Sequence, residues 1–133
     1  YPDIPVLTEP DRGGHVLVID DQESVAGYLK EVLGQHGYEV TAITDANEAL
    51  AVFHADPARF DLVITDQTMP GISGDQVMAS IHKARPGLPV ILCTGYSETI
   101  GERAARELGA SGHLAKPLDT DRLLGLIHES LQP

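Results

Sequence analysis

The residues of this chain that could take part in chemistry are acids, a threonine and a lysine, and each stands at the end of a short apolar run. The runs HVLVI, DLVIT, VILC and GHLA are followed by Asp20 with Asp21, Asp66, Thr94 and Lys116. Adjacent carboxylates at a buried strand end repel each other and lose hydration, so they need a counter-charge. Such carboxylates can hold a hard divalent cation, and a carboxylate beside it can act as a nucleophile toward a phosphoryl group.

Whether these side chains meet depends on the elements that carry them. Apolar and β-branched runs predict strands at residues 15–19, 39–43, 61–65, 90–94 and 112–115. Helical periodicity predicts helices at residues 24–36, 45–53, 73–81, 99–108 and 119–131. Strict alternation of strand and helix predicts an α/β fold, with a parallel sheet covered on both faces. Ligand sites in such sheets lie beyond the carboxyl ends of the strands, so the candidate side chains are expected on one rim.

The helices also carry start and stop signals. A polar cap followed three residues later by Glu or Gln opens three of them: Asp45 with Glu48, Ser73 with Gln76, and Thr99 with Glu102. Gly37 and Gly109 are expected to end the helices that precede them. The spacing of Val25, Leu29, Val32, Leu33 and His36 predicts that they share one face of the first helix.

Composition bounds the class of protein. The chain has 133 residues, which fit one domain, and 9 basic against 20 acidic residues give a net charge of −11. This balance argues against direct nucleic-acid binding and favours cations or basic partners. No apolar run approaches the ~18 residues of a membrane span. No signal peptide is visible, so a cytoplasmic domain without membrane contact is expected. The single cysteine, Cys93, lies in an apolar run and is predicted to be a buried thiol.

The chain divides into an arm and one domain. Residues 1–14, YPDIPVLTEPDRGG, contain three prolines and two closing glycines, which predicts a linker or N-terminal arm. Residues 15–133 are expected to form the domain. The histidines other than His113 have no metal-ligand spacing and are expected on the surface or on helix faces.

The ordered set DD, D-x-T-M-P-G, T-G and K-P resembles the response-regulator receiver domains of two-component signalling, from about His15 to the C-terminus. The resemblance implies a flavodoxin-like (βα)5 three-layer sandwich with a five-stranded parallel sheet of order 2-1-3-4-5. It also implies a phospho-accepting signalling module. Such a module takes a phosphoryl group from a histidine kinase in a Mg²⁺-dependent reaction and then changes conformation.

The resemblance assigns roles to the acids. Asp66 would be the phospho-acceptor, and Asp21 would bind Mg²⁺ directly. Asp20 would bind the metal largely through water, and the main-chain carbonyl of Thr68 would complete the protein ligands.

It also assigns roles on the other side of the rim. Lys116 would pair with the phosphoryl group, Thr94 would be the switch hydroxyl, and the peptide bond between Lys116 and Pro117 would be cis. His113 stands where the family usually has a Tyr or Phe that swings inward on phosphorylation. A histidine can stack and swing as well, but it also titrates near neutrality.

Two other functions compete with this one. A Mg²⁺-dependent phosphohydrolase with an aspartyl nucleophile would carry its second acid two residues after the first, and LVIDDQE lacks that spacing. A degenerate receiver that serves only as a docking module would have lost an acid or the lysine, and none is lost. The domain itself would catalyse only its own phosphorylation and dephosphorylation, which leaves its status as an enzyme open.

The wider context is also an expectation. The stretch ILCTGYSE resembles receivers at the C-terminal end of hybrid sensor histidine kinases, whose parent protein can be membrane-anchored. The favoured interpretation places this receiver behind a kinase core that donates the phosphoryl group, with onward transfer to a histidine phosphotransfer protein. The alternative is a stand-alone receiver or one cut from ahead of an output domain. A phosphorylation-dependent dimer is a further expectation.

Overall fold

The computed structural model describes residues 14–95 and 102–131. Its centre is one parallel sheet with the strand order β2-β1-β3-β4-β5, which confirms the predicted topology. The strands are β1 (Gly14–Ile19), β2 (Tyr38–Ile43), β3 (Leu62–Asp66), β4 (Val90–Thr94) and β5 (Gly112–Ala115). Each boundary lies within one residue of the prediction.

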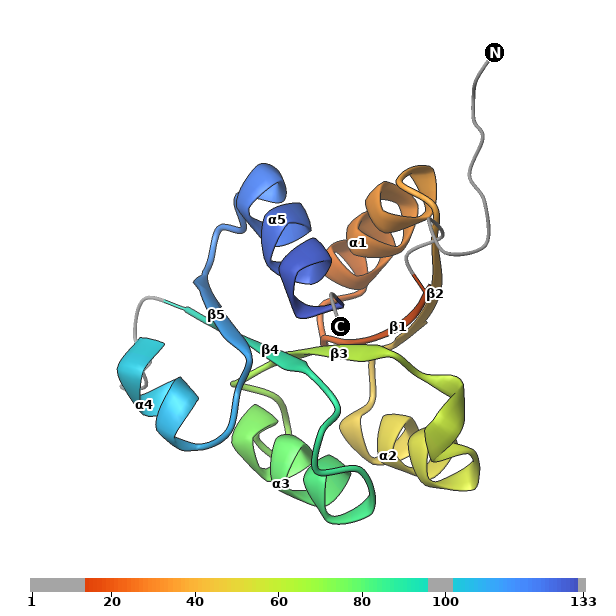
Figure 1. Cartoon of the computed structure of the whole chain (residues 1–133), viewed down its shortest axis with the longest axis vertical. Helices are drawn as coiled ribbons and strands as arrows, with labels where there is room; N and C mark the ends of the chain where they lie inside the picture. The colour runs from red at the N-terminus through yellow and green to blue at the C-terminus, as the bar shows by residue number, and fades with distance from the viewer. Residues whose placement is uncertain (1–13, 96–101, 132–133) are drawn as a thin grey trace.

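Helices cover both faces of this sheet. They are α1 (Glu23–Gln35), α2 (Ala46–Ala55), α3 (Gly74–Ala84), α4 (Glu102–Glu107) and α5 (Thr120–Ser130), with a short 3-10 turn η2 (Pro57–Arg59) after α2. Figure 1 shows α1 and α5 on one face and α2, α3 and α4 on the other. The predicted three-layer sandwich is therefore confirmed.

The inner strands are buried on both faces because their side chains alternate between two hydrophobic cores. Val16 and Val18 of β1 pack into the core under α1 and α5, whereas Leu17 and Ile19 pack into the core over α2 and α3. Burying each such side chain stabilises the fold by ~1.5–3 kcal/mol. Double-sided burial explains why these strands are nearly continuous apolar runs.

The caps explain where several helices begin. Ser73 and Gln76 form the reciprocal capping box at α3, with the Ser73 N–H donating to Gln76 Oε1 at 3.0 Å. Asp45 caps α2 by accepting from the Asn47 N–H at 3.3 Å. Gly109 follows α4 with a φ of 109°, a conformation that glycine adopts without strain. The predicted start of that helix at Thr99 lies outside the described residues.

His36 is exposed at the C-cap of α1, as expected of a surface histidine, and the helix ends one residue before it. The prediction for His15 is wrong. His15 lies in β1 and is only 7% exposed. Its Nε2 lies 2.7 Å from Thr41 Oγ1, and its ring packs on Phe60 with centroids 4.8 Å apart. Burial lowers the pKa of His15, although the Glu39 carboxylate opposes this shift.

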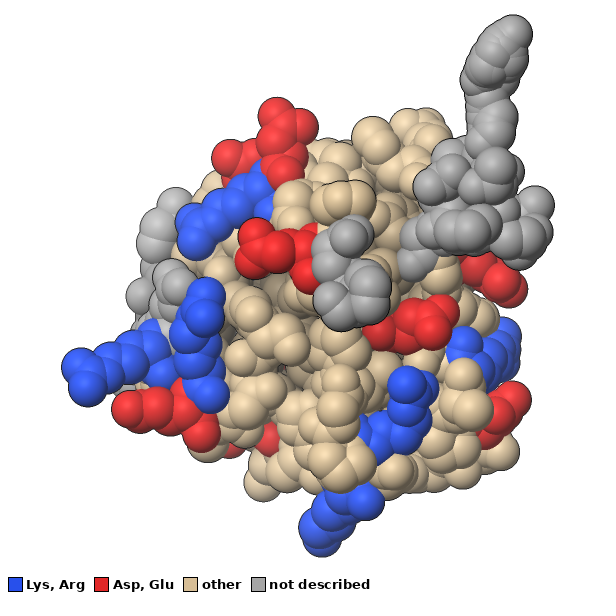
Figure 2. All heavy atoms as spheres, in the orientation of Figure 1, with Lys and Arg blue, Asp and Glu red and all other residues tan. Residues whose placement is uncertain are grey.

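Charged side chains of both signs are spread over the surface. On the face shown in Figure 2, basic and acidic side chains are both scattered, with uncharged surface between them. Within the described parts of the chain, no helix is both long enough and apolar enough to cross a membrane.

Candidate functional site

Three aspartates meet at the carboxyl ends of β1 and β3. These strands pair in parallel with Ile19 opposite Thr65, so the residues that follow them become neighbours. Asp20, Asp21 and Asp66 each offer a carboxylate oxygen within 4.8 Å of the others. Asp20 is 3% exposed and Asp66 is 6% exposed, whereas Asp21 faces solvent. The sheet topology therefore gathers the acids that the sequence singled out.

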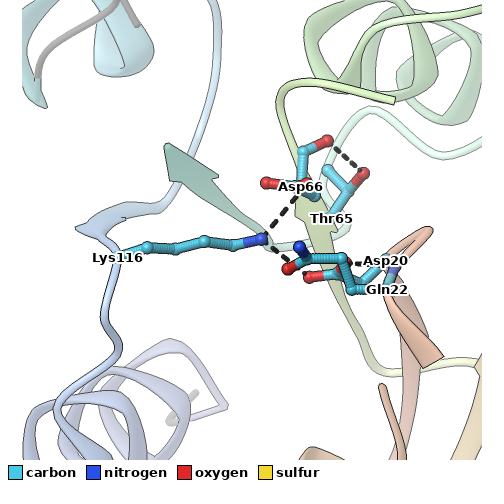
Figure 3. A network of polar contacts seen from close by, with 5 residues as sticks. All are labelled: Asp20, Gln22, Thr65, Asp66 and Lys116. Carbon is cyan, nitrogen blue, oxygen red and sulfur yellow. Dashed lines mark hydrogen bonds and ion pairs between the residues drawn. The ribbon is translucent and has the colours of Figure 1, made fainter. Parts of the chain in front are cut away.

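Lys116 supplies the counter-charge that this cluster needs. Its Nζ lies 3.1 Å from Asp20 Oδ2 and 3.2 Å from Asp66 Oδ2. Figure 3 shows the lysine reaching from the end of β5 to a point between the two carboxylates. The Lys116 N–H donates to the Thr94 carbonyl at 2.7 Å, which ties the base of the side chain to β4. The peptide bond between Lys116 and Pro117 is cis.

The electrostatics of the site centre on Asp66. Burial and, to a smaller extent, the negative charge of Asp20 raise the pKa of Asp66 to about 6, against the opposing effect of Lys116. Burial alone would lower the pKa of Lys116, but its ion pairs with Asp20 and Asp66 outweigh this and the net shift is upward. The cluster therefore holds more negative charge than one ammonium balances.

Local hydrogen bonds fix the two buried acids. Asp20 Oδ1 accepts from the Gln22 N–H at 2.9 Å, which leaves Oδ2 for the lysine. The Thr65 hydroxyl donates to the Asp66 carbonyl at 3.1 Å, and both contacts are visible in Figure 3. The turn after β1 thus orients the Asp20 carboxylate, whereas the Thr65 contact holds the main chain of Asp66.

The fourth and fifth strands bring Thr94 and His113 together. Thr94 Oγ1 lies 2.8 Å from His113 Nε2, and either atom can donate according to the tautomer. Thr94 is buried and His113 is half-buried. In this structure the hydroxyl predicted to act as the switch is therefore already engaged by the histidine.

A cavity of about 280 Å³ opens over the acids and is lined by Asp21, Gln22, Asp66, Thr68, Gly95 and Lys116. Its donors fit Mg²⁺, because this ion prefers carboxylate and carbonyl oxygens and keeps several waters. Thr68 lines the same cavity as the acids. The roles of these residues as ligands stay predictions.

Sequence reasoning missed one feature of the site, a pair of hydrogen bonds between the side chain of Gln67 and Asp75. Gln67 Nε2 donates to Asp75 Oδ1 at 2.9 Å, and the Asp75 N–H donates to Gln67 Oε1 at 3.0 Å. Gln67 lies in the loop after β3 and Asp75 in the first turn of α3, eight positions further on, and no periodic pattern links them.

Comparison with known proteins is consistent with this geometry. The family model for the response regulator receiver domain matches residues 16–128. The Sensory transduction protein RegX3 of Mycobacterium tuberculosis is 37% identical over 117 residues, which are 88% of this chain and 50% of that protein. The Transcriptional regulatory protein GlrR of Escherichia coli is 34% identical over 91% of this chain and 27% of its own length. The chain spans about half or less of these curated relatives.

Solved structures agree in fold. A response regulator receiver domain protein from Clostridium thermocellum superposes with a TM-score of 0.84 at 31% identity, covering 89% of this chain and 94% of that one. The chemotaxis protein CheY4 of Vibrio cholerae gives a TM-score of 0.79 at 29% identity, covering 89% and 98%. Since the family model spans most of the chain, this chain belongs to the family of response regulator receiver domains.

Proposed function

We propose that this receiver domain accepts a phosphoryl group on Asp66 from the phosphohistidine of a histidine kinase. The observation that carries the proposal is the position of Asp66, buried at the end of β3 with Lys116 Nζ at 3.2 Å, under an open cavity. A family of two-component signalling implies a histidine kinase as partner. Which kinase donates the group belongs to the proposal.

Receiver domains generally bind Mg²⁺ at an acidic pocket, and this chain gathers three aspartates close enough to share an ion. In our proposal Asp21, Asp66 and the main-chain carbonyl of Thr68 hold the ion, and Asp20 binds it largely through water. The metal would neutralise charge on the transferring phosphoryl oxygens.

Phosphoryl transfer from the histidine to Asp66 changes no oxidation state. A carboxylate oxygen of Asp66 attacks phosphorus, and the P–N bond of the phosphohistidine breaks. The electron pair stays on the imidazole nitrogen, which takes up a proton from water. Lys116 then contacts a phosphoryl oxygen, and this contact replaces its present ion pair with the Asp66 carboxylate. Hydrolysis of the acyl phosphate by water returns the carboxylate and releases inorganic phosphate.

Signal output is proposed to begin at Thr94. A phosphoryl oxygen offers its hydroxyl a charged acceptor, which forms a stronger hydrogen bond than a neutral one. Thr94 would then leave His113 Nε2, now 2.8 Å away, and free the histidine to change rotamer. That change would bias the surface of α4, β5 and α5 between two states.

The competing functions are less well supported. A phosphohydrolase would need a second acid two residues beyond a nucleophile after β1, where this chain has Gln22. A docking-only receiver would lack part of the acidic cluster or the lysine, and all four residues converge here. The hybrid-kinase context and onward transfer to a histidine phosphotransfer protein stay predictions, as does dimer formation. Relatives include a protein named as a DNA-binding transcriptional regulator, so an output domain is an equal alternative.

Labelling with an acyl-phosphate donor tests the proposal. Acetyl phosphate with Mg²⁺ is expected to add one phosphoryl group to the wild type, seen by intact mass, and none to Asp66→Asn. Asp56→Asn, at an exposed acid after α2, is the matched control and should label normally. Steady turnover without accumulated label would favour the phosphohydrolase. No label under any condition would favour the docking module, and normal labelling of Asp66→Asn would overturn the assignment of Asp66.

A further inference from the structure

The first residue of the loop between β3 and α3, Gln67, is held in place by hydrogen bonds. The Gln67 N–H donates to the Cys93 carbonyl at 2.8 Å, and its own carbonyl accepts from the Gly74 N–H at 2.9 Å. Its side chain exchanges two further hydrogen bonds with Asp75, at 2.9 and 3.0 Å. Gln67 is therefore held by both its main chain and its side chain, to β4 on one side and to the start of α3 on the other.

The far end of the loop is equally constrained. Ser73 Oγ donates to Asp75 Oδ1 at 2.5 Å, so one carboxylate oxygen collects two donors. A Cβ at Gly74 would lie 2.8 Å from Leu92 Cδ1 and 2.9 Å from the Cα of Gln67. The absence of a side chain at Gly74 lets the start of α3 close directly onto the end of β3. The loop is thus a short bridge with both ends anchored.

The residue that this bridge places at the cavity is Thr68, which follows Gln67 directly and lines the cavity with Asp21 and Asp66. A metal ligand supplied by the main chain can be aimed only by fixing the backbone around it. Hydrogen-bonded partners outside the ligand set commonly perform this task at metal sites. Gln67 and Asp75 are the residues whose side chains brace that backbone.

We propose that the hydrogen-bonded pair of Gln67 and Asp75 is a positioning element for Mg²⁺ binding, because it holds the main chain of Thr68 beside Asp66. The inference rests on the proposed function, in which the Thr68 carbonyl is a ligand. Neither side chain touches the metal or the phosphoryl group in this scheme. Both act through the backbone, and a pair that served only to begin α3 would leave the affinity for Mg²⁺ unchanged.

The test compares Mg²⁺ affinity, measured by calorimetry, across matched variants. Gln67→Ala and Gln67→Met, which keeps the side-chain volume but cannot hydrogen-bond, are both expected to weaken Mg²⁺ binding about tenfold. Asp75→Asn keeps an amide oxygen for Gln67 and Ser73 while removing a charge, so it should stay within about twofold of wild type. Ser80→Ala breaks the 2.9 Å contact between Ser80 and His54 elsewhere on α3. It controls for general loosening of that helix and should bind Mg²⁺ normally.

A second readout needs no metal. In EDTA, the amide hydrogen of Asp75 should exchange faster in Gln67→Ala than in the wild type, and Ser80→Ala should leave it unchanged. Wild-type affinity in both Gln67 variants would overturn the inference, as would an equal loss in Ser80→Ala. A wild-type chain that binds no Mg²⁺ would overturn the proposed function instead, so the two failures are distinct.

Discussion

Lys116 Nζ lies 3.1 Å from one oxygen of Asp20 and 3.2 Å from one oxygen of Asp66, so a single ammonium is shared by two buried carboxylates. The shared ion pairs offset part of the free-energy cost of burying two carboxylates at the edge of the core. It also leaves the site with a net negative charge, since Asp21 adds a third carboxylate. The first two predictions follow from that imbalance.

Removing the shared cation should destabilise the fold. Lys116→Met leaves two buried carboxylates without their shared cation. We expect the free energy of unfolding to fall by roughly 2–3 kcal/mol, which is less than for a fully buried ion pair because the lysine is partly exposed. Urea denaturation at pH 7.5 in EDTA measures the change. Lys30→Met, at an exposed lysine of α1, is the control. Equal unfolding free energies for the two variants would mean that the ion pairs contribute nothing.

Neutralising Asp66 should stabilise the metal-free fold at neutral pH. Burial raises the pKa of Asp66 from 3.8 to about 6 in the folded state. Between pH 3.8 and about 6 the folded state therefore keeps a proton that the unfolded state has lost. Above about pH 6 Asp66 is ionised in both states, and the folded state carries the full free-energy cost of the buried charge. Asp66→Asn is expected to stabilise the metal-free protein at pH 7.5 by at most about 3 kcal/mol. This gain should shrink as the pH falls toward 4. A gain that is constant from pH 4 to 8 would contradict the raised pKa.

Asp21 should matter for the metal and little for the fold. Because it faces solvent, Asp21→Ala is expected to leave the melting temperature in EDTA nearly unchanged. Mg²⁺ raises the melting temperature of the wild type by mass action, and this rise should disappear in Asp21→Ala. Glu31→Ala, at an exposed acid on α1, should keep it. A full Mg²⁺-dependent rise in Asp21→Ala would remove that residue from the proposed ligand set.

His113 should oppose activation. The hydrogen bond between His113 and Thr94 must break before the hydroxyl can reach a phosphoryl oxygen. A hydrogen bond of this kind stabilises by ~1 kcal/mol, so His113→Phe should bind the phosphoryl mimic beryllofluoride a few-fold more tightly. NMR titration measures the affinity, with His36→Phe at an exposed position as the control. Weaker binding by His113→Phe would show that the histidine assists the switch.

His15 should make the fold sensitive to mild acid. Burial depresses the pKa of His15 below its usual 6.5, so the unfolded chain takes up a proton more readily than the folded one below that pH. The stability contributed by the neutral ring is present above pH 6.5 and is lost as the pH falls. His15→Gln can still bond to Thr41 but cannot titrate. Its unfolding free energy should fall less steeply from pH 7 to 5 than that of the wild type.

The sequence predicted that the candidate side chains lie together at one edge of the sheet, because the ends of the strands are clearly marked. An apolar run that stops at Asp20 or Asp66 indicates both the strand and its end, and parallel topology then brings those ends together. The same reasoning predicted each strand to within one residue. Fold and site were predictable here because one pattern determines both.

What the sequence did not reveal are contacts between side chains from separate elements. Nothing local indicates that Lys116 bridges Asp20 and Asp66, or that Gln67 reaches Asp75. His15 was expected on the surface or on a helix face because its spacing shows no metal-ligand pattern. Here Thr41 on the neighbouring strand and the ring of Phe60 provide a partner and a cover. Such pairings depend on register and rotamer, which no spacing rule supplies.

The burial of Cys93 has a practical consequence. It is the single cysteine of the chain, and burial raises its thiol pKa to about 12, so maleimides and other alkylating reagents should leave it untouched in the native protein. Cysteines introduced at both of the exposed residues Tyr28 and Leu108 could then carry a pair of spin labels or fluorophores without replacement of Cys93. The movement proposed for the surface around α4 could be followed in that way as a change in distance, in solution and in real time.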